Sequence, residues 1–119
     1  MRFKDRFKQA RDTYVVNQAR RAKLPQFAPD CLRRYRVVFS GRVQKVGFRL
    51  EVSELAGRLG LTGFCQNLEN GDVLAELQGP DNKIQYLISF MESLKRIKIR
   101  NKVMTELEPD TDEIAFVQK

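Results

Sequence analysis

Alternation of apolar and polar positions opens the central part of this chain. Tyr35, Val37 and Phe39 lie two residues apart, the spacing at which side chains point to one face of a strand. The pattern predicts a first strand over residues 35–40, followed by a glycine-bearing loop over residues 41–47.

The spacing of apolar residues then changes to that of a helix in two places. Gly60 follows the first segment, where a left-handed C-terminal cap is expected, and Gly79-Pro80-Asp81 supplies start signals for the second. The apolar stripe of the first helix is Phe48, Val52, Leu55, Ala56 and Leu59. That of the second is Ile84, Leu87, Ile88, Met91 and Leu94. Both segments are expected to pack one face on a core.

Strands are expected between and after these helices. Residues 61–68 and 72–78 flank Asn70-Gly71, a pair that supplies the positive φ angles of a tight hairpin turn. Residues 102–108 and 114–119 are shorter candidate strands. The order strand, helix, strand, strand, helix, strand predicts the α+β class, a ferredoxin-like βαββαβ sandwich with two helices on one face of an antiparallel sheet.

That topology brings two distant loops together. The first and second strands run parallel with the third strand between them, so their ends emerge at one edge of the sheet. The loop after Ser40 is therefore expected beside Asn67.

Residues 1–34 differ from the rest in charge and pattern. Ten Lys or Arg against three Asp give this segment +7, whereas residues 35–119 hold 12 basic and 12 acidic residues and are formally neutral. Pro25 and Pro29 indicate a linker. We divide the chain into a basic, helical extension and linker, 1–34, and a domain, 35–119.

The extension places four side chains on one helical face: Phe3, Phe7, Ala10 and Tyr14. This face is expected to pack on the exposed face of the chain's own sheet, with a second subunit or an acidic partner as alternatives. The partner of the extension is unknown, and the extension is expected to be dispensable for catalysis.

The amino-acid composition limits which catalytic and metal-binding groups the chain can supply. Histidine is absent, which removes the commonest general base and zinc ligand. Cys31 and Cys65 are expected as free thiols, Cys65 as a small buried residue. No apolar run reaches the length of a membrane span or secretory signal, so the expected location is cytoplasmic. What remains is a set of groups suited to binding and orienting an anion.

An anion site is predicted where the first strand passes into the first helix. Free amides at a helix N-terminus and the helix dipole favour negative charge. Arg49 lies in the expected first turn, where its planar guanidinium can hold two phosphoryl oxygens.

Two separated motifs here resemble the acylphosphatase family. The matching residues are Gly41-Arg42-Val43-Gln44, Val46-Gly47-Phe48-Arg49 and Gly63-Phe64-Cys65-Gln66-Asn67. The similarity continues through Asn70-Gly71 and Leu77-Gln78-Gly79-Pro80, over about 85 residues given by 119 − 34. Two motifs in a compatible strand order are far more specific than one glycine motif.

The resemblance implies a hydrolase of the carboxyl-phosphate bond that releases inorganic phosphate without a metal or cofactor. It implies that Arg49 and the loop amides bind the phosphoryl group, and that Asn67 orients the attacking water. The loop residues concerned are Gln44, Lys45, Val46, Gly47 and Phe48. The Arg42 and Gln44 side chains are expected to support the loop, and Phe39, Phe48 and Phe64 to lie in the core.

Lys45 departs from the family, which usually has glycine at this position. If the position needs a positive φ, a side chain there costs on the order of 1 kcal/mol. Either the loop is displaced, or the ammonium adds a second cation beside the phosphate. We expect loop geometry to matter more, so that Lys45→Gly raises turnover.

Two other functions stay open on the sequence. One is a non-catalytic anion-binding or regulatory module of the same fold. The other is an RNA-binding ferredoxin-like domain with a basic arm. The neutral charge of 35–119 and the lack of an aromatic residue in 72–78 count against nucleic acid.

Overall fold

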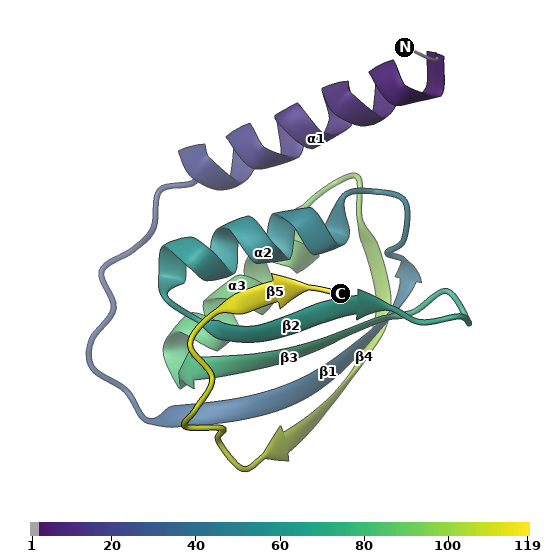
Figure 1. Ribbon diagram of the computed structural model, residues 1–119. Coiled ribbons are helices and arrows are strands. Elements are labelled where there is room, and N and C mark those ends of the chain that lie inside the picture. The colour runs from purple at the N-terminus through teal and green to yellow at the C-terminus, as the bar shows by residue number, and fades with distance from the viewer. Residues whose placement is uncertain (1–2) are drawn as a thin grey trace.

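A five-stranded sheet with helices on one side forms the molecule (Figure 1). The computed structural model describes the backbone of residues 3–119 and the side chains from residue 8 onward. The elements are α1 (Phe3–Arg21), β1 (Leu32–Arg42), α2 (Phe48–Leu59), β2 (Thr62–Asn67), β3 (Val73–Pro80), α3 (Asp81–Ser93), β4 (Lys98–Leu107) and β5 (Phe116–Gln118).

The strand order β4-β1-β3-β2-β5 confirms the ferredoxin-like topology. β3 pairs antiparallel with both β1 and β2, so β1 and β2 run parallel on either side of it. β4 pairs antiparallel with β1 at one edge. β5 adds a short parallel strand beside β2, which makes five strands instead of the four of the βαββαβ unit. Loop 43–47 and the last residue of β2 therefore lie at the same end of the sheet, where β1 and β2 both finish.

The core lies between the sheet and helices α2 and α3. Both predicted helical stripes are buried there, and Gly60 ends α2 with a φ of 71° as expected. Phe39 and Phe48 are core residues whose ring centroids lie 5.0 Å apart. The expectation for Phe64 was wrong. Its neighbours Gly63 and Cys65 are buried, so the alternation along β2 turns the half-buried Phe64 to the opposite face, where the Lys119 Nζ lies 3.8 Å from its ring centroid.

The β2–β3 connection is a hairpin, but not the tight two-residue turn expected from Asn70-Gly71. Residues 68–72 join the two strands, and of the two central residues only Gly71 has a positive φ, 97°. The Asn70 Oδ1 instead accepts a 3.0 Å hydrogen bond from the Asp72 amide. A side chain that closes the turn in this way removes the need for a second left-handed residue.

Ion pairs cover part of the open sheet face. Arg34, only 5% exposed, donates to Glu76 at 2.9 Å and to Glu113 at 2.8 Å. Arg36 contacts the other oxygen of Glu76 at 3.0 Å. Burial is the largest single effect on Glu113 and acts to raise its pKa, but the hydrogen bonds and charge of Arg34, together with Thr62 and the charge of Lys119, leave the pKa lowered.

Helix α1 packs on α2, on the helical side of the molecule (Figure 1). The expectation that it would pack on the open sheet face was wrong. Its fully buried side chains among those described are Val15 and Ala19, whereas Tyr14 is 58% exposed and Ala10 is exposed. The side chains of Phe3 and Phe7 lie outside the described residues. The docked face is thus offset from the predicted aromatic stripe, because small side chains let two helices approach closely.

The segment between α1 and β1 contacts α3. The rings of Phe27 and Tyr86 meet edge to face with centroids 5.5 Å apart, and Asn82 Nδ2 donates to the Ala28 oxygen at 2.8 Å. These contacts fix the path of the linker. The division of the chain near residue 34 stays a prediction.

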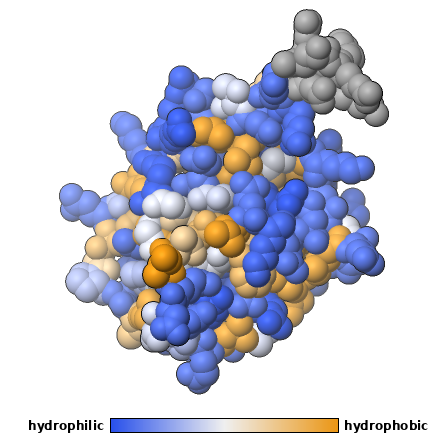
Figure 2. Space-filling model, in the orientation of Figure 1, coloured by the Kyte–Doolittle hydropathy of each residue, from blue (hydrophilic) through white to orange (hydrophobic). Residues whose placement is uncertain are grey.

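Hydrophilic residues cover most of the face drawn in Figure 2, and hydrophobic residues show in separate patches between them. Among residues 3–119, no helix combines the length and the apolar character that crossing a membrane requires.

Candidate functional site

A cleft of about 480 Å³ brings the main predicted site residues together. Arg49 and Asn67 both line it, from the first turn of α2 and the last residue of β2. Of the predicted loop residues, the cleft includes Lys45, Gly47 and Phe48, whereas Gln44 and Val46 do not line it. The parallel arrangement of β1 and β2 is what places the two motifs beside each other.

Loop 43–47 leaves its amides available for a ligand. Its turn into α2 begins at Gly47, whose φ of 79° makes it the left-handed cap of the helix, and the Glu51 amide donates to its oxygen at 3.0 Å. Among the described residues, the amides of residues 44–48 have no hydrogen-bond acceptor. Free amides beside a helix N-terminus supply fixed partial positive charge for an anion.

Lys45 adopts the left-handed conformation expected of a glycine. Its φ is 62°, and it is the one non-glycine residue with a positive φ in the described chain. The position therefore has the positive φ that a glycine takes freely, although it carries a side chain. The conformation costs on the order of 1 kcal/mol for a residue with a Cβ.

Arg49 is half-buried and held by one hydrogen bond. Its Nη1 donates to the backbone oxygen of Lys119 at 2.7 Å. A guanidinium carries five N–H donors in a planar fork. Among the described residues, that of Arg49 has no second hydrogen-bond acceptor. Arg49 can therefore present a fork to two oxygens of a phosphoryl group.

Asn67 is exposed at the edge of the sheet, and its backbone pairs with Val73. A strand end fixes the position of its Cα, while the side-chain amide can both donate and accept a hydrogen bond.

Gln44 joins the two halves of the site. Its Nε2 donates to the oxygens of Leu68 and Asp72, both at 2.8 Å. The side chain thus ties loop 43–47 to the hairpin that follows Asn67. This matches the supporting role expected of the Gln44 side chain.

Arg96 supports the loop from behind, and sequence reasoning missed it. Its Nε donates to the Val46 oxygen at 2.9 Å, and its Nη2 to Glu51 at 2.7 Å. Glu51 is completely buried, so burial raises its pKa, against the opposing effect of Arg96. Arg96 lies between α3 and β4, outside both motifs, and its type and spacing carry no signal of this role.

Helix α1 also lines the cleft, which the sequence did not indicate. Lys8, Arg11 and Asp12 come from this helix. The Arg11 Nη2 lies 3.1 Å from the Asp12 carboxylate, and its Nη1 donates to the Lys45 oxygen at 3.1 Å. From residue 8 onward, the cleft wall combines Lys8, Arg11, Lys45 and Arg49 with the side-chain carboxylate of Asp12, a balance that favours an anionic ligand.

Catalysis by a cysteine finds less support. Burial raises the pKa of the Cys65 thiol to about 12, so this cysteine is a poor nucleophile, as expected. No cluster of three or more Cys, Asp or Glu side chains suited to a metal ion occurs in the part of the chain that the structure describes.

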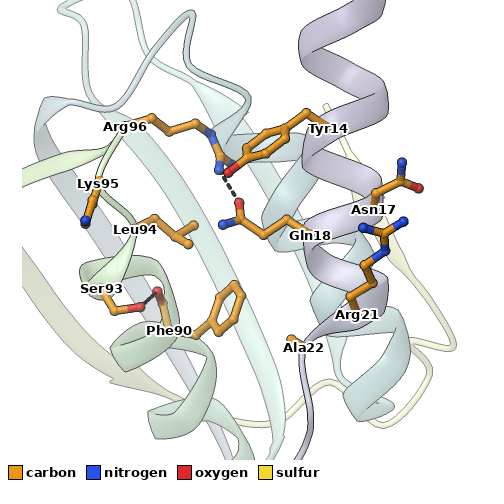
Figure 3. Close-up of a pocket in the computed structure, with 10 residues that line it drawn as sticks. All are labelled: Tyr14, Asn17, Gln18, Arg21, Ala22, Phe90, Ser93, Leu94, Lys95 and Arg96. Atoms are coloured by element: carbon orange, nitrogen blue, oxygen red, sulfur yellow. Dashed lines mark hydrogen bonds between the residues drawn. The ribbon is translucent and has the colours of Figure 1, made fainter.

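A larger cavity of about 800 Å³ lies between α1 and the end of α3 (Figure 3). Tyr14, Phe90 and Lys95 are among its lining residues, and none of the predicted site residues reaches it. Size alone does not make it the reactive site. The smaller cleft has the free amides, the guanidinium and the helix N-terminus.

Comparison with known proteins agrees with the family resemblance seen in the sequence. A sequence model of the family described as acylphosphatase matches residues 35–117. An acylphosphatase of Clostridium beijerinckii is 44% identical over 63 residues, which cover 53% of this chain and 67% of the relative. One of Methanocella arvoryzae is 37% identical over 73 residues, covering 60% and 83%. The crystal structure of acylphosphatase from Bacillus subtilis superposes with a TM-score of 0.68 at 29% identity, covering 75% of this chain and 99% of that one.

Proposed function

We propose, from the premise that this chain belongs to the acylphosphatase family of acyl-phosphate hydrolases, that its catalytic groups are Arg49, the amides of loop 43–47 and Asn67. Arg49 and the amides hold the phosphoryl group, and Asn67 orients the water that attacks it. The observation that carries the proposal is that one cleft contains Arg49, Asn67 and the free end of α2.

The phosphoryl group is held by fixed donors. Loop amides and the guanidinium approach it from a preformed loop and from the first turn of a helix, so little reorganisation is needed as charge develops. Such donors accelerate the reaction only as far as they bind the transition state better than the ground state.

Water attacks phosphorus in line with the departing carboxylate. A bond forms between the water oxygen and phosphorus, the bond from phosphorus to the acyl oxygen breaks, and its electron pair leaves on the carboxylate. The proton of the water passes to a phosphoryl oxygen, so the products are a carboxylate and inorganic phosphate. Because the carboxylate is a good leaving group, positioning and charge stabilisation replace a strong protein base.

The test is hydrolysis of benzoyl phosphate by the full chain, with Arg49→Ala and Asn67→Ala as variants. Each is expected to lower turnover about a hundredfold or more while the fold stays intact, since each removes a group used in the transition state. Arg49→Ala is also expected to weaken inhibition by inorganic phosphate. Addition of a chelator is expected to leave turnover unchanged.

Arg33→Ala is the matched control. Arg33 lies at the opposite end of β1 and contacts Glu106 at 2.8 Å, so its loss removes one positive charge without touching the cleft. Near-normal turnover in a folded Arg49→Ala variant would remove Arg49 from the mechanism. Phosphate binding without any turnover of benzoyl phosphate would support the non-catalytic module instead.

A further inference from the structure

One face of α1 packs against loop 43–47, which we call the phosphate loop. Arg11, Val15 and Gln18 are spaced by four and three residues, which places them on one side of the helix. Through them α1 contacts loop 43–47 both directly and by way of Arg96.

The first contact is at the left-handed residue. The Arg11 Nη1 donates to the Lys45 oxygen at 3.1 Å. Lys45 has a φ of 62°, a conformation that a lysine rarely adopts unless other contacts hold it. A charged donor on its carbonyl fixes the orientation of the peptide that follows.

The second contact is by packing. Gly47 lies so close to α1 that a Cβ at this position would come within 2.7 Å of Val15 Cγ2. Val15 is completely buried. The helix therefore forms a wall behind the last residue of the loop.

The third contact runs through Arg96. Gln18 accepts a hydrogen bond from the Arg96 Nη1, as Figure 3 shows. The Arg96 guanidinium also lies 5.9 Å from the centre of the Tyr14 ring. Two α1 side chains thus orient the residue whose Nε donates to the Val46 oxygen at 2.9 Å.

We infer that α1 is a brace for the phosphate loop and that Arg11 is a positioning residue for catalysis. Three consecutive loop residues, 45–47, are held from outside, two by their carbonyl oxygens and one by packing. The brace stabilises the left-handed conformation of Lys45 and keeps the loop amides turned toward the cleft. This inference rests on the proposed function.

The match to the acylphosphatase family begins at residue 35, so the brace lies outside the matched segment. The same chain has lysine where the resembling motif has glycine. A glycine takes a positive φ freely, but a lysine needs contacts that hold it there. The brace therefore changes two expectations from the sequence. Lys45→Gly should alter turnover little while Arg11 is present, and the extension, which contains Arg11, should not be dispensable for catalysis.

A double-mutant cycle in the full chain tests the brace. Arg11→Ala is expected to lower kcat for benzoyl phosphate about tenfold, and to weaken binding of inorganic phosphate by a similar factor. In the Lys45→Gly background the same change is expected to lower kcat by no more than about twofold, because glycine keeps the loop conformation without help. Coupling of this kind is what a cycle between contacting residues measures.

Arg20→Ala is the matched control, since it removes the same charge from the same helix. Arg20 lies 3.8 Å from Glu54 and does not line the cleft. It is expected to leave kcat and phosphate binding within twofold of the parent chain. An equal loss with Arg20→Ala would show that only the net charge of α1 matters and would overturn the brace.

The background decides between a brace and direct contact with the substrate. If Arg11 binds the substrate itself, Arg11→Ala lowers kcat equally in the parent chain and in the Lys45→Gly variant, and the inference is wrong. Phosphate binding is followed by calorimetry, which requires no hydrolysis. A chain that binds phosphate, shows the rescue by Lys45→Gly in binding, and turns over no acyl phosphate would keep the brace and reject the proposed function.

Discussion

Two loops carry the candidate site, and they are held in opposite ways. Connection 68–72, which follows Asn67, closes on itself: the Leu68 amide donates to the Asp72 oxygen at 2.8 Å and the Gly71 amide to the Leu68 oxygen at 3.2 Å. Its left-handed residue is a glycine. Loop 43–47 contains a left-handed lysine. Its own carbonyl oxygens accept hydrogen bonds from α1 and from Arg96, and its Gln44 side chain reaches across to connection 68–72.

The difference follows from what each loop has to leave free. A turn that only connects two strands can satisfy its own amides. A loop that binds an anion must keep its amides for the ligand, so hydrogen bonds within the loop cannot stabilise it. Its carbonyl oxygens and its packing against other elements then determine its shape. A loop that binds an anion through its backbone amides therefore needs contacts from distant elements to hold its shape.

Loss of Arg96 should have the largest effect on this contrast. Arg96→Met removes the donor to Val46 and leaves the buried Glu51 without its cation, a change that typically costs about 3–5 kcal/mol. The free energy of unfolding, measured by urea titration, is expected to fall accordingly, and turnover at low temperature to fall about tenfold.

A second variant separates the ion pair from the loop. Arg96→Met combined with Glu51→Gln removes the unpaired charge, so stability should recover in part while turnover stays low. Full recovery of turnover in the double variant would mean that Arg96 serves Glu51 alone and does not support the loop.

Gln44→Ala should have an intermediate effect, because it removes a side chain that ties the two loops together. Two hydrogen bonds are lost from partly buried positions, worth about 1–2 kcal/mol in unfolding free energy. Turnover of benzoyl phosphate is expected to fall about fivefold, because Asn67 and Arg49 are then held less firmly relative to each other. A loss of stability with unchanged kcat and KM would contradict this link.

Asn70→Ala should have the smallest effect. The side chain closes only its own turn: it accepts a 3.0 Å bond from the Asp72 amide and donates an exposed 3.1 Å bond to the Asp72 carboxylate, so about 0.5–1 kcal/mol of stability is at stake. Turnover is expected to stay within twofold of the parent chain. Measured beside Asn67→Ala, this variant is also the matched asparagine control for the catalytic assignment. A large fall in turnover would show that the hairpin depends on more than local bonds.

Much of the sheet and part of the site could be predicted from the sequence. Periodicity placed α2 and α3, and the strand order put Arg49 and Asn67 at one edge, as found. These features depend on local spacing and on a topology with few alternatives.

The support of the loop could not be predicted, because it depends on contacts between residues far apart in the chain. Arg11 and Lys45 are 34 positions apart, and Arg96 and Val46 are 50 apart. Long, flexible side chains make these contacts, and such contacts produce no periodic pattern in the sequence that could predict them. The docked face of α1 was also misplaced: its aromatic stripe suggested apolar docking, whereas the fully buried side chains from residue 8 onward are the smaller Val15 and Ala19.

The position of α1 in the chain has a consequence for the order of folding. α1 comes first in the sequence, yet its partners, α2, the phosphate loop and Arg96, are all made later. An isolated helix of this length is only marginally stable in water before those partners exist. The sheet and its two covering helices can therefore assemble before α1 docks. In that order of folding the chain would have Arg49 and Asn67 in place before the loop is supported, so we expect the site to reach its final form only when α1 docks.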